Sequence, residues 1–492
     1  MTDLHLPLDR AAGRLAAQIA AGLRAAVRSG RLAAGTRLPS SRDLSRDLDV
    51  SRGVVVAAYE QLVAEGFLLS RRGDGTRVAP LARPDEPAPP RAGTERPPGG
   101  PDPSGHPSGG PSGHPSGLSP GGPPGGFHLD LWPGAPDLAA FPRGRWLTAV
   151  RAVLRTLPNE ALAYPDPGGA GALRAELAGY LRRVRAAHAG AGQIVIMNGV
   201  AQGLSVLVRQ LAGDGHRLLA VEDPTSDRQF PMLDAAGVRL AHVPVDSEGL
   251  DVAALARTGA RAVLVTPAHQ YPTGVVLSPA RRAALIAWAR DVDGLVLEDD
   301  YDAEFRYDRE PVGCLQGVDP ERVVLLGSVS KSLAPALRLG WVVAPPGVAE
   351  RLRAHRSRTD LGGPVLEQYA LAEFLASGTY DRHLRQMRRQ YRSRRDALAE
   401  ALRAHIPDAV VHGVAAGIHL YVELPPGCDE RRVVTDAAKA GVAVAGAAPM
   451  WSGARSAHAP PALVLGYARL GEARLAQAAE LLGTVITHPA QG

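Results

Sequence analysis

The sequence contains very little lysine and very little cysteine. Its 492 residues include 55 lysines and arginines, and only Lys331 and Lys439 are lysine. Because arginine keeps its proton in proteins, a reaction that needs a side-chain amine has to use one of these two lysines. Cys314 and Cys428 are the only cysteines. This excludes a disulfide framework and a cysteine-rich metal site, and it fits a reducing compartment.

Long apolar runs are also missing. No stretch of 18 apolar residues occurs, and no apolar run near Met1 is long enough for a signal sequence. We therefore expect no membrane association and a cytoplasmic location. The length predicts two to four domains, and a hydrophobic content of 45% is ordinary for a globular protein.

Positive charge is concentrated at the N-terminus. Residues 1–79 contain 12 arginines and 8 acidic residues, so this segment holds +4 of the net charge of +5. A small basic segment in front of a nearly neutral body indicates a polyanion as partner.

The same segment has the pattern of a winged helix-turn-helix. Apolar residues recur every four positions in a helix predicted over 8–29, and shorter helices are predicted over 42–48 and 52–65, with a tight turn between them. Strands over 67–70 and 76–79 would form a hairpin, the wing. The second helix of such a pair enters the DNA major groove. A helical interaction domain with a solvated charged face is the alternative.

Eight residues of this segment are suited to DNA, because arginines and helix N-termini both favour phosphate. They stand at helix starts and in the wing: Arg42, Ser51, Arg52, Gly53, Arg71, Arg72, Gly73 and Gly75. The strings 30–44, 50–52 and 58–67 resemble the GntR family of winged-helix regulators. The resemblance implies operator DNA as partner, contacted at the positions of Arg42 and Arg52 and by the glycines of the wing.

Residues 80–126 consist mostly of proline, glycine, serine and alanine. They lack the apolar residues that would offset the entropy cost of ordering, so we expect a disordered linker. The chain then divides into 1–79, 80–126 and 127–492, the last with a smaller subdomain from about residue 350. We expect no metal site at the histidines in or beside the linker, His106, His114 and His128.

Strand-like and helix-like segments alternate through residues 127–492. Short apolar runs predict strands over 194–197, 217–221, 262–266, 295–298 and 323–326. Helical patterns lie between them, for example over 201–212 and 279–291. This order predicts an α/β fold with a mostly parallel sheet, in which ligands bind at the carboxyl ends of the strands.

Lys331 follows the last of these strands. It stands beside Ser328 and Ser330 and seven residues before Arg338. A lysine amine forms Schiff bases with aldehydes, and hydroxyl and guanidinium groups bind phosphate. An aldehyde that carries a phosphate is pyridoxal phosphate (PLP). The alternative is a surface lysine in a polar loop.

Two other strand ends support PLP. The segment 199–203 follows a strand and opens a helix, where backbone N–H groups can bind a phosphate. Asp299 ends an apolar strand, where a protonated pyridinium nitrogen would be a suitable partner, and Tyr301 can bond the ring oxygen. An ion-pair network of Asp299 with Arg306 is the alternative. The three strand ends together favour PLP.

Four strings of this region resemble PLP-dependent aminotransferases of fold type I, in the class I family: 164–174, 266–274, 298–307 and 328–340. With the winged helix, the whole chain resembles the MocR/GabR-type regulators. The resemblance implies Lys331 as the Schiff-base lysine, Asp299 on the pyridine nitrogen and Tyr301 on the ring oxygen. It also implies a homodimer, and cofactor contacts by Ala201, Gln202, Tyr271, Ser328, Ser330, Arg338 and, from the second subunit, Tyr164.

Three positions depart from the enzyme pattern. Ser226 replaces the aromatic residue that stacks on the cofactor ring, and Tyr271 stands in place of an asparagine. Val464 aligns with the arginine that binds the substrate carboxylate, and Arg469 is displaced from that position. A valine cannot form a bidentate bond with a carboxylate.

These departures favour a transcriptional regulator over an enzyme. The regulator would sense PLP or an amino compound through an aldimine at Lys331 and would control vitamin B6 or amino-acid metabolism, a pattern that resembles the PdxR branch of the family. It would be associated with the nucleoid when bound to DNA. An active aminotransferase with an added DNA-binding arm is the alternative, and a fold that has lost PLP is a third. Residual transamination is chemically possible, because the lysine, the acid and the tyrosine are all present.

Overall fold

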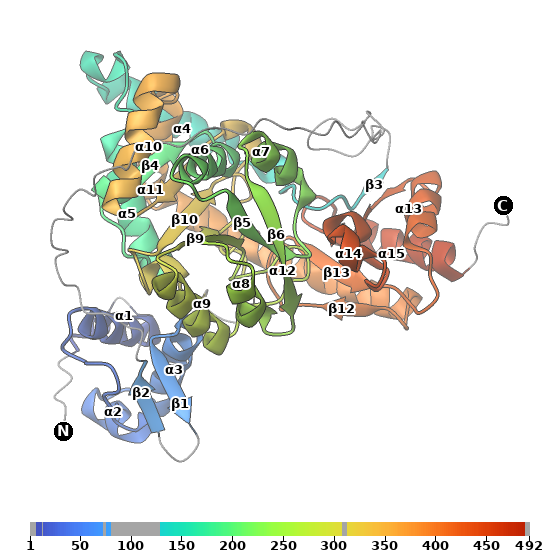
Figure 1. Cartoon of the computed structure of the whole chain (residues 1–492), viewed down its shortest axis with the longest axis horizontal. Helices are drawn as coiled ribbons and strands as arrows, with labels where there is room; N and C mark the ends of the chain where they lie inside the picture. Colours follow the sequence, from blue (N-terminus) through green and yellow to red (C-terminus); the bar gives the residue numbers. More distant parts are fainter. Residues whose placement is uncertain (1–5, 12, 72–74, 80–127, 308–311, 488–492) are drawn as a thin grey trace, which may run out of the picture.

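The computed structural model describes residues 6–487, apart from residue 12 and the segments 72–74, 80–127 and 308–311. The predicted linker and two predicted wing residues, Arg72 and Gly73, lie outside the described residues. The chain forms a small winged helix beside a large α/β body (Figure 1). Among the described residues, no helix has the length and apolar character needed to cross a membrane.

The winged helix consists of three helices and a hairpin: α1 (Leu15–Arg28), α2 (Ser41–Asp47), α3 (Arg52–Glu65), β1 (Leu68–Arg71) and β2 (Gly75–Val78). The Ser40 hydroxyl caps α2 by accepting a hydrogen bond from the backbone N–H of Asp43 at 3.2 Å. Gly66 ends α3 with a φ of 85°, a left-handed conformation that glycine adopts readily. The predicted second and third helices and the hairpin are thus confirmed to within about a residue.

The predicted start of the first helix is wrong. We expected a helix over 8–29, but α1 begins only at Leu15, because Gly13 and Arg14 have positive φ values of 65° and 52°. A left-handed backbone cannot continue a right-handed helix. The first turn of α1 has neither a side-chain cap nor an acidic residue.

The body is built on an eight-stranded sheet with the order β4-β11-β10-β9-β8-β5-β6-β7. The four pairings from β10 to β6 are parallel, and the pairings of β4, β7 and β11 are antiparallel. The bounds are β4 (Ile194–Met197), β5 (Leu218–Asp223), β6 (Arg239–Asp246), β7 (Gly249–Leu250), β8 (Ala262–Val265), β9 (Leu295–Asp299), β10 (Val323–Ser328) and β11 (Gly340–Val343). All five predicted strands are present.

Both faces of this sheet are buried. In β4, Ile194 and Ile196 join one hydrophobic core, and Val195 and Met197 join another, as the two-residue repeat of a strand requires. The surrounding helices are α4 (Arg143–Thr156), α5 (Gly171–Arg185), α6 (Val200–Gly213), α7 (Phe230–Ala235), α8 (Val252–Arg257), α9 (Pro279–Asp291), α10 (Pro346–Thr359) and α11 (Leu366–Ala376).

A second, four-stranded sheet with the order β12-β13-β16-β15 lies toward the C-terminus. Its strands are antiparallel, and it forms the orange and red region of Figure 1. The elements of this part are α12 (Thr379–His405), β12 (Val410–His412), β13 (His419–Glu423), α13 (Glu430–Lys439), β14 (Val442–Ala443), β15 (Ala445–Gly446), α14 (Gly453–Ser456), β16 (Ala462–Gly466) and α15 (Glu472–Thr487). The short strand β3 (Leu129–Asp130) pairs with β14, so the start of the body joins this part.

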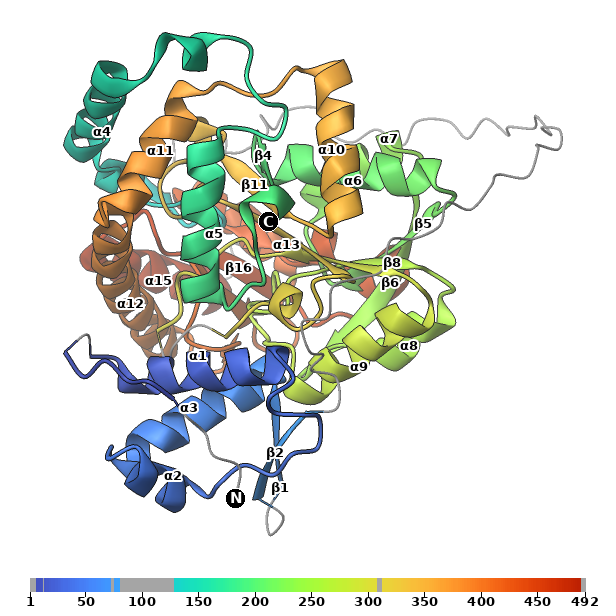
Figure 2. The ribbon, with the colours of Figure 1, turned by 90° about the vertical axis from the view of Figure 1, so that its left-hand side faces the viewer.

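The winged helix packs directly on the body. α1 lies below the lower ends of α5 and α12 in Figure 2. The Arg28 guanidinium donates hydrogen bonds to the carbonyl oxygens of Ala186 (2.6 Å) and Gly317 (2.7 Å). One hydrophobic core contains Leu23 of α1 together with Leu285 of α9.

Candidate functional site

A cavity of about 200 Å³ lies where the end of the large sheet meets the C-terminal sheet. Four residues predicted for the cofactor line it: Lys331, Asp299, Tyr301 and Tyr271. The remaining wall is formed by Pro133, Gly134, Glu222, Thr225, Ser226, Arg228, Gln229, Leu264, Thr266, Ile418 and His419. The fold therefore gathers at one point side chains that are far apart in the sequence.

The Lys331 amine lies on the wall of this cavity and donates a hydrogen bond to the Gly134 carbonyl oxygen. Burial lowers the pKa of Lys331, and Arg228 lowers it further, while Asp299 opposes the change. A lowered pKa increases the fraction of neutral amine, which is the form that attacks an aldehyde.

Asp299 is the last residue of β9 and lies opposite Leu326 of β10. Its Oδ1 atom is buried and has no hydrogen-bond partner in the part of the chain that the structure describes. Burial raises the pKa of Asp299 to about 7, and Asp300 adds to the rise, while Lys331 opposes it. Among the described residues, Asp300 forms an ion pair with Arg185 at 2.7 Å, and Asp299 forms none. A carboxylate oxygen without a partner is suited to a proton donor such as a pyridinium nitrogen.

Tyr301 belongs to a buried hydrogen-bonded group with His269 and Asp302. The Tyr301 hydroxyl lies 3.0 Å from both Nδ1 and the carbonyl oxygen of His269, and this Nδ1 lies 3.0 Å from Oδ2 of Asp302. Because an ionised carboxylate only accepts hydrogen bonds, Nδ1 carries the proton and the Tyr301 hydroxyl donates to the carbonyl oxygen. His269 and Asp302 were not predicted as site residues, although each lies within two residues of a predicted one.

His419 completes a group that has the ligand types of a metal site. The ligand atoms of His269, Asp302 and His419 lie within 4.8 Å of one another. His419 Nε2 bonds the Pro272 carbonyl oxygen at 3.1 Å, and burial lowers the pKa of His419 to about 4. Each of the three bonds a protein group, so we assign them to a hydrogen-bond network.

The residues predicted for the phosphate gather at the start of α6. Ser328 pairs with Gly340, and Gly340 pairs with Met197, so the ends of β10, β11 and β4 meet there. The Arg338 guanidinium donates to the Asn198 carbonyl oxygen. A Cβ atom on Gly199 would lie 3.1 Å from Arg338 Nη1, so glycine leaves the guanidinium room to approach the helix start.

Gln202 and Ser330 of this group already have partners. Gln202 accepts a hydrogen bond from Asn198 N (2.7 Å) and donates one to Asp360 (2.7 Å), and Ser330 N donates to the Ser328 hydroxyl (3.3 Å). The wall of the 200 Å³ cavity does not include the five residues predicted for the phosphate: Ala201, Gln202, Ser328, Ser330 and Arg338. Tyr164 is 88% exposed and also lies outside the cavity wall.

The position expected for a substrate arginine holds no cation. Val464 is fully buried in β16 opposite Tyr421, and Arg469 is paired with Asp130. A guanidinium reaches the cavity from elsewhere, since Arg228 lines it and makes no hydrogen bond or ion pair within the described residues. Arg228 follows Ser226 by two residues, and no sequence pattern marked it.

The residues predicted for DNA are exposed at the helix starts of the winged helix. Arg42, Ser51, Arg52 and Gly53 are all exposed, and the Arg52 Nε donates to the Ser41 hydroxyl at 3.2 Å. Gly75 and Arg71 lie on the two paired strands of the wing. α2 and the hairpin lie on the side away from the body (Figure 2).

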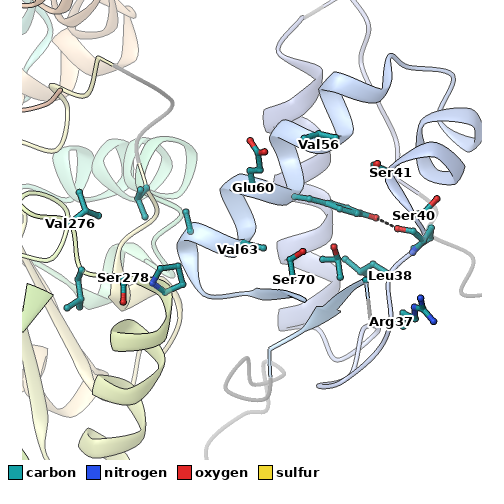
Figure 3. A pocket seen from close by; sticks show the side chains of 18 residues that line it. Arg37, Leu38, Ser40, Ser41, Val56, Glu60, Val63, Ser70, Val276 and Ser278 are labelled. Atoms are coloured by element: carbon teal, nitrogen blue, oxygen red, sulfur yellow. Dashed lines mark hydrogen bonds between the residues drawn. The ribbon is translucent and has the colours of Figure 1, made fainter. Parts of the chain in front are cut away.

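A larger cavity, of about 660 Å³, separates α3 from residues 276–279 of the body (Figure 3).

Comparisons with known proteins agree with this architecture. Residues 15–78 match the bacterial regulatory proteins of the gntR family, and residues 141–449 match aminotransferase class I and II. The HTH-type pyridoxine biosynthesis transcriptional regulator PdxR of Corynebacterium glutamicum is 35% identical over 445 residues, covering 89% of this chain and 88% of that protein. The probable rhizopine catabolism regulatory protein MocR of Rhizobium meliloti is 33% identical over 409 residues, covering 82% and 79%.

Solved aminotransferases share the fold of the body. An archaeal alanine:glyoxylate aminotransferase matches with a TM-score of 0.67 and 25% identity, covering 73% of this chain and 91% of that one. The kynurenine aminotransferase of Pyrococcus horikoshii, in complex with PMP, also matches with a TM-score of 0.67 and 25% identity, covering 74% and 92%. The solved enzymes cover 73–74% of this chain, whereas the two regulators cover 82–89% of it. The chain therefore belongs to the MocR-type transcriptional regulators, in which a GntR-family helix-turn-helix precedes an aminotransferase-like domain.

Proposed function

We propose that this regulator binds PLP at Lys331 and that PLP, or an amine that reacts with it, changes the binding of the winged helix to operator DNA. The observation that carries the proposal is the pairing of two features in one cavity. Lys331 has a lowered pKa, and the buried Oδ1 of Asp299 lacks a hydrogen-bond partner among the described residues. An amine and a carboxylate in this arrangement fit the aldehyde and the ring nitrogen of PLP.

When bound, PLP would supply an aldehyde for covalent attachment to a lysine. In our proposal Lys331 provides the amine and Asp299 keeps a proton on the ring nitrogen. Tyr301, held by His269, would bond the ring oxygen, and Tyr271 would flank the ring at the cavity wall. The phosphate would lie at the start of α6 with Ala201, Gln202, Ser328, Ser330 and Arg338.

The proposed effector is PLP itself rather than an amino acid. An amino-acid carboxylate requires a guanidinium, and the expected position holds the buried Val464. Control of vitamin B6 metabolism also agrees with the name of the Corynebacterium relative. Arg228 on the cavity wall is the group through which an acidic amine would still bind, so amino-acid sensing is the second candidate.

We further propose a cytoplasmic homodimer made of three parts, 1–79, 80–126 and 127–492. Tyr164 supports the dimer, since an aromatic side chain that is 88% exposed is suited to contact a second subunit. Operator contacts are assigned to Arg42, Ser51, Arg52, Gly53, Arg71, Arg72, Gly73 and Gly75.

The test compares the wild type with Lys331→Ala, and Lys439→Ala serves as control because it removes the only other lysine, an exposed one. Visible absorbance after addition of PLP should be present in the wild type and the control and absent in Lys331→Ala. Operator binding of the wild type and the control should respond to PLP. No absorbance in the wild type would refute PLP binding, and steady formation of a keto acid from an amino acid would indicate an enzyme.

A further inference from the structure

A second charged cavity lies between the winged helix and the body, apart from the Lys331 site. Its volume is about 400 Å³, within the size range of small-ligand pockets. α1 and α3 form one side, and α5 and α12 form the other. Any ligand in this cavity would contact both parts of the protein at once.

Arginine dominates the lining. Six guanidinium side chains and two carboxylates contribute to it: Arg14, Arg24, Arg182, Arg183, Arg385 and Arg388, with Glu65 and Asp381. Both carboxylates already form ion pairs with arginines of the same lining. Glu65 forms a buried bidentate pair with Arg24 at 2.7–3.0 Å, and Asp381 pairs with Arg183 at 2.9 Å.

Four arginines of the lining therefore have no carboxylate partner among the described residues: Arg14, Arg182, Arg385 and Arg388. Arg182 and Arg388 each donate one hydrogen bond to a backbone carbonyl oxygen, of Ala178 and Glu304 respectively. The guanidinium groups of Arg14 and Arg385 make no hydrogen bond or ion pair with the described residues. Like charges that converge on one cavity repel one another, so this arrangement favours a bound anion.

The position of Arg14 strengthens this conclusion. It occupies the N-cap of α1 in a left-handed conformation, and the first turn has neither a side-chain cap nor an acid. A helix N-terminus carries partial positive charge, so a cation there is unfavourable unless an anion is present. Arg182, by contrast, lies in the last turn of α5, where the helix dipole favours a cation.

DNA is not the occupant that the geometry favours. α3 has 14 residues and is therefore about 20 Å long. The cavity contacts Gln61 and Glu65 at the C-terminal end of this helix, whereas Arg52, the proposed DNA contact, lies at its first residue. A duplex bound at the start of α3 thus lies about a helix length away, and a small anion remains.

We propose that this cavity binds a small polyanion with two or more phosphate groups, which links α1 to α5 and α12. Guanidinium groups bind phosphate through paired charge-assisted hydrogen bonds, and one phosphate alone would not neutralise four of them. The ligand would hold the winged helix against the body, so it is a regulator of DNA binding that acts independently of PLP.

The experiment measures binding of inorganic pyrophosphate to the full chain by calorimetry at low ionic strength. The test variant is Arg14→Gln with Arg385→Gln, and the control is Arg209→Gln with Arg403→Gln, which removes the same charge from other exposed positions. We expect one pyrophosphate per chain and at least about tenfold weaker binding in the test variant, since two charge-assisted contacts are lost. The control should bind like the wild type.

Folding and the PLP site are checked separately. Because the guanidinium groups of Arg14 and Arg385 have no partners among the described residues, the test variant should unfold at the same temperature as the wild type or higher without pyrophosphate. Each single variant should show an intermediate affinity. Arg338→Gln should leave pyrophosphate binding unchanged. The proposal is overturned by absence of binding to the wild type, by equal binding in the test variant, or by loss of binding in Arg338→Gln.

Discussion

Replacing Asp299 with asparagine should have opposite effects on the cofactor-free and the PLP-bound protein. In the cofactor-free protein, burial raises the pKa of Asp299 from an ordinary 3.8 to about 7. Folding therefore disfavours the ionised form of Asp299. The free energy of unfolding that this group contributes falls as the pH rises from about 4 to about 7. Asparagine carries no charge, so the variant escapes this loss.

The size of the effect follows from linkage. Each unit of pKa difference corresponds to 1.36 kcal/mol, so the raised pKa of Asp299 costs the folded state about 4 kcal/mol at pH 8, where the folded group is ionised, and about 1.5 kcal/mol at pH 5, where it is protonated. The stability of Asp299→Asn relative to the wild type should therefore improve by about 2.5 kcal/mol between pH 5 and pH 8. This difference does not depend on how well the amide itself packs, because that contribution is the same at both pH values.

Urea unfolding of the cofactor-free proteins at pH 5 and pH 8 measures this quantity. A difference between the proteins that stays constant with pH would refute the assignment of a raised pKa to Asp299. In the presence of PLP the wild type should be the more stable protein. The charged carboxylate of Asp299 then gains a pyridinium partner, with which asparagine cannot form an ion pair. Asp299→Asn should bind PLP more weakly than the wild type at pH 8, and equal affinity would contradict the proposed role of Oδ1.

Three other substitutions test the packing of the winged helix, the Tyr301 network and the DNA surface. Gly313→Ala places a Cβ atom 2.8 Å from Glu65 Cδ, so it should loosen the winged helix by about 1–3 kcal/mol and increase its proteolysis. Gly417→Ala adds a Cβ atom 2.2 Å from the His269 ring at a φ of 73°, so it should lower stability by more than about 3 kcal/mol and weaken PLP binding. Arg52→Gln should weaken operator binding and reduce the slope of log affinity against log salt by about 1.

The chain offers a matched control for each. Gly179→Ala, on α5, adds a Cβ atom with no neighbour within 4 Å and should be neutral or stabilising. Gly427→Ala places alanine at a positive φ of 85°, as Gly417→Ala does at 73°, but no atom lies within 4 Å of the added Cβ. It therefore measures the backbone strain without the clash with His269. Arg209→Gln removes one exposed arginine from α6 and should not alter the salt slope. Equal effects in a variant and its control would contradict the corresponding explanation.

Local elements were predictable where neighbouring residues specify them. Ser51 before α3 and Gly66 after it mark both ends of that helix, and the predicted bounds match the structure. Apolar runs such as Ile194–Met197 mark strands because both faces of the central sheet are buried. The start of α1 could not be predicted this way, because the apolar repeat gives no sign of the left-handed conformation at Gly13 and Arg14.

Some residues of the candidate site were also predictable from the sequence, and others were not. The rarity of lysine and the strings around Lys331 and Asp299 sufficed to predict a PLP-type site and the family, because the chemistry of an amine and of a strand-end carboxylate is carried by the residue itself. Arg228 and His419 escaped prediction. Neither stands in a recognisable string. Arg228 reaches the cavity from the turn that follows β5, and His419 reaches it from β13 of the C-terminal sheet.

The sequence alone determined the two-part architecture, the local elements and the residues that carry distinctive chemistry, since periodicity, capping and side-chain type act over a few neighbouring positions. The tertiary structure decided which of those groups are left without partners. Three features depend on what packs around them in the described part of the chain: the Oδ1 of Asp299 without a partner, the buried Val464 and the guanidinium of Arg14 without a partner. Burial and long-range contact set the energy of a charge, and neither quantity is written in the residues beside it.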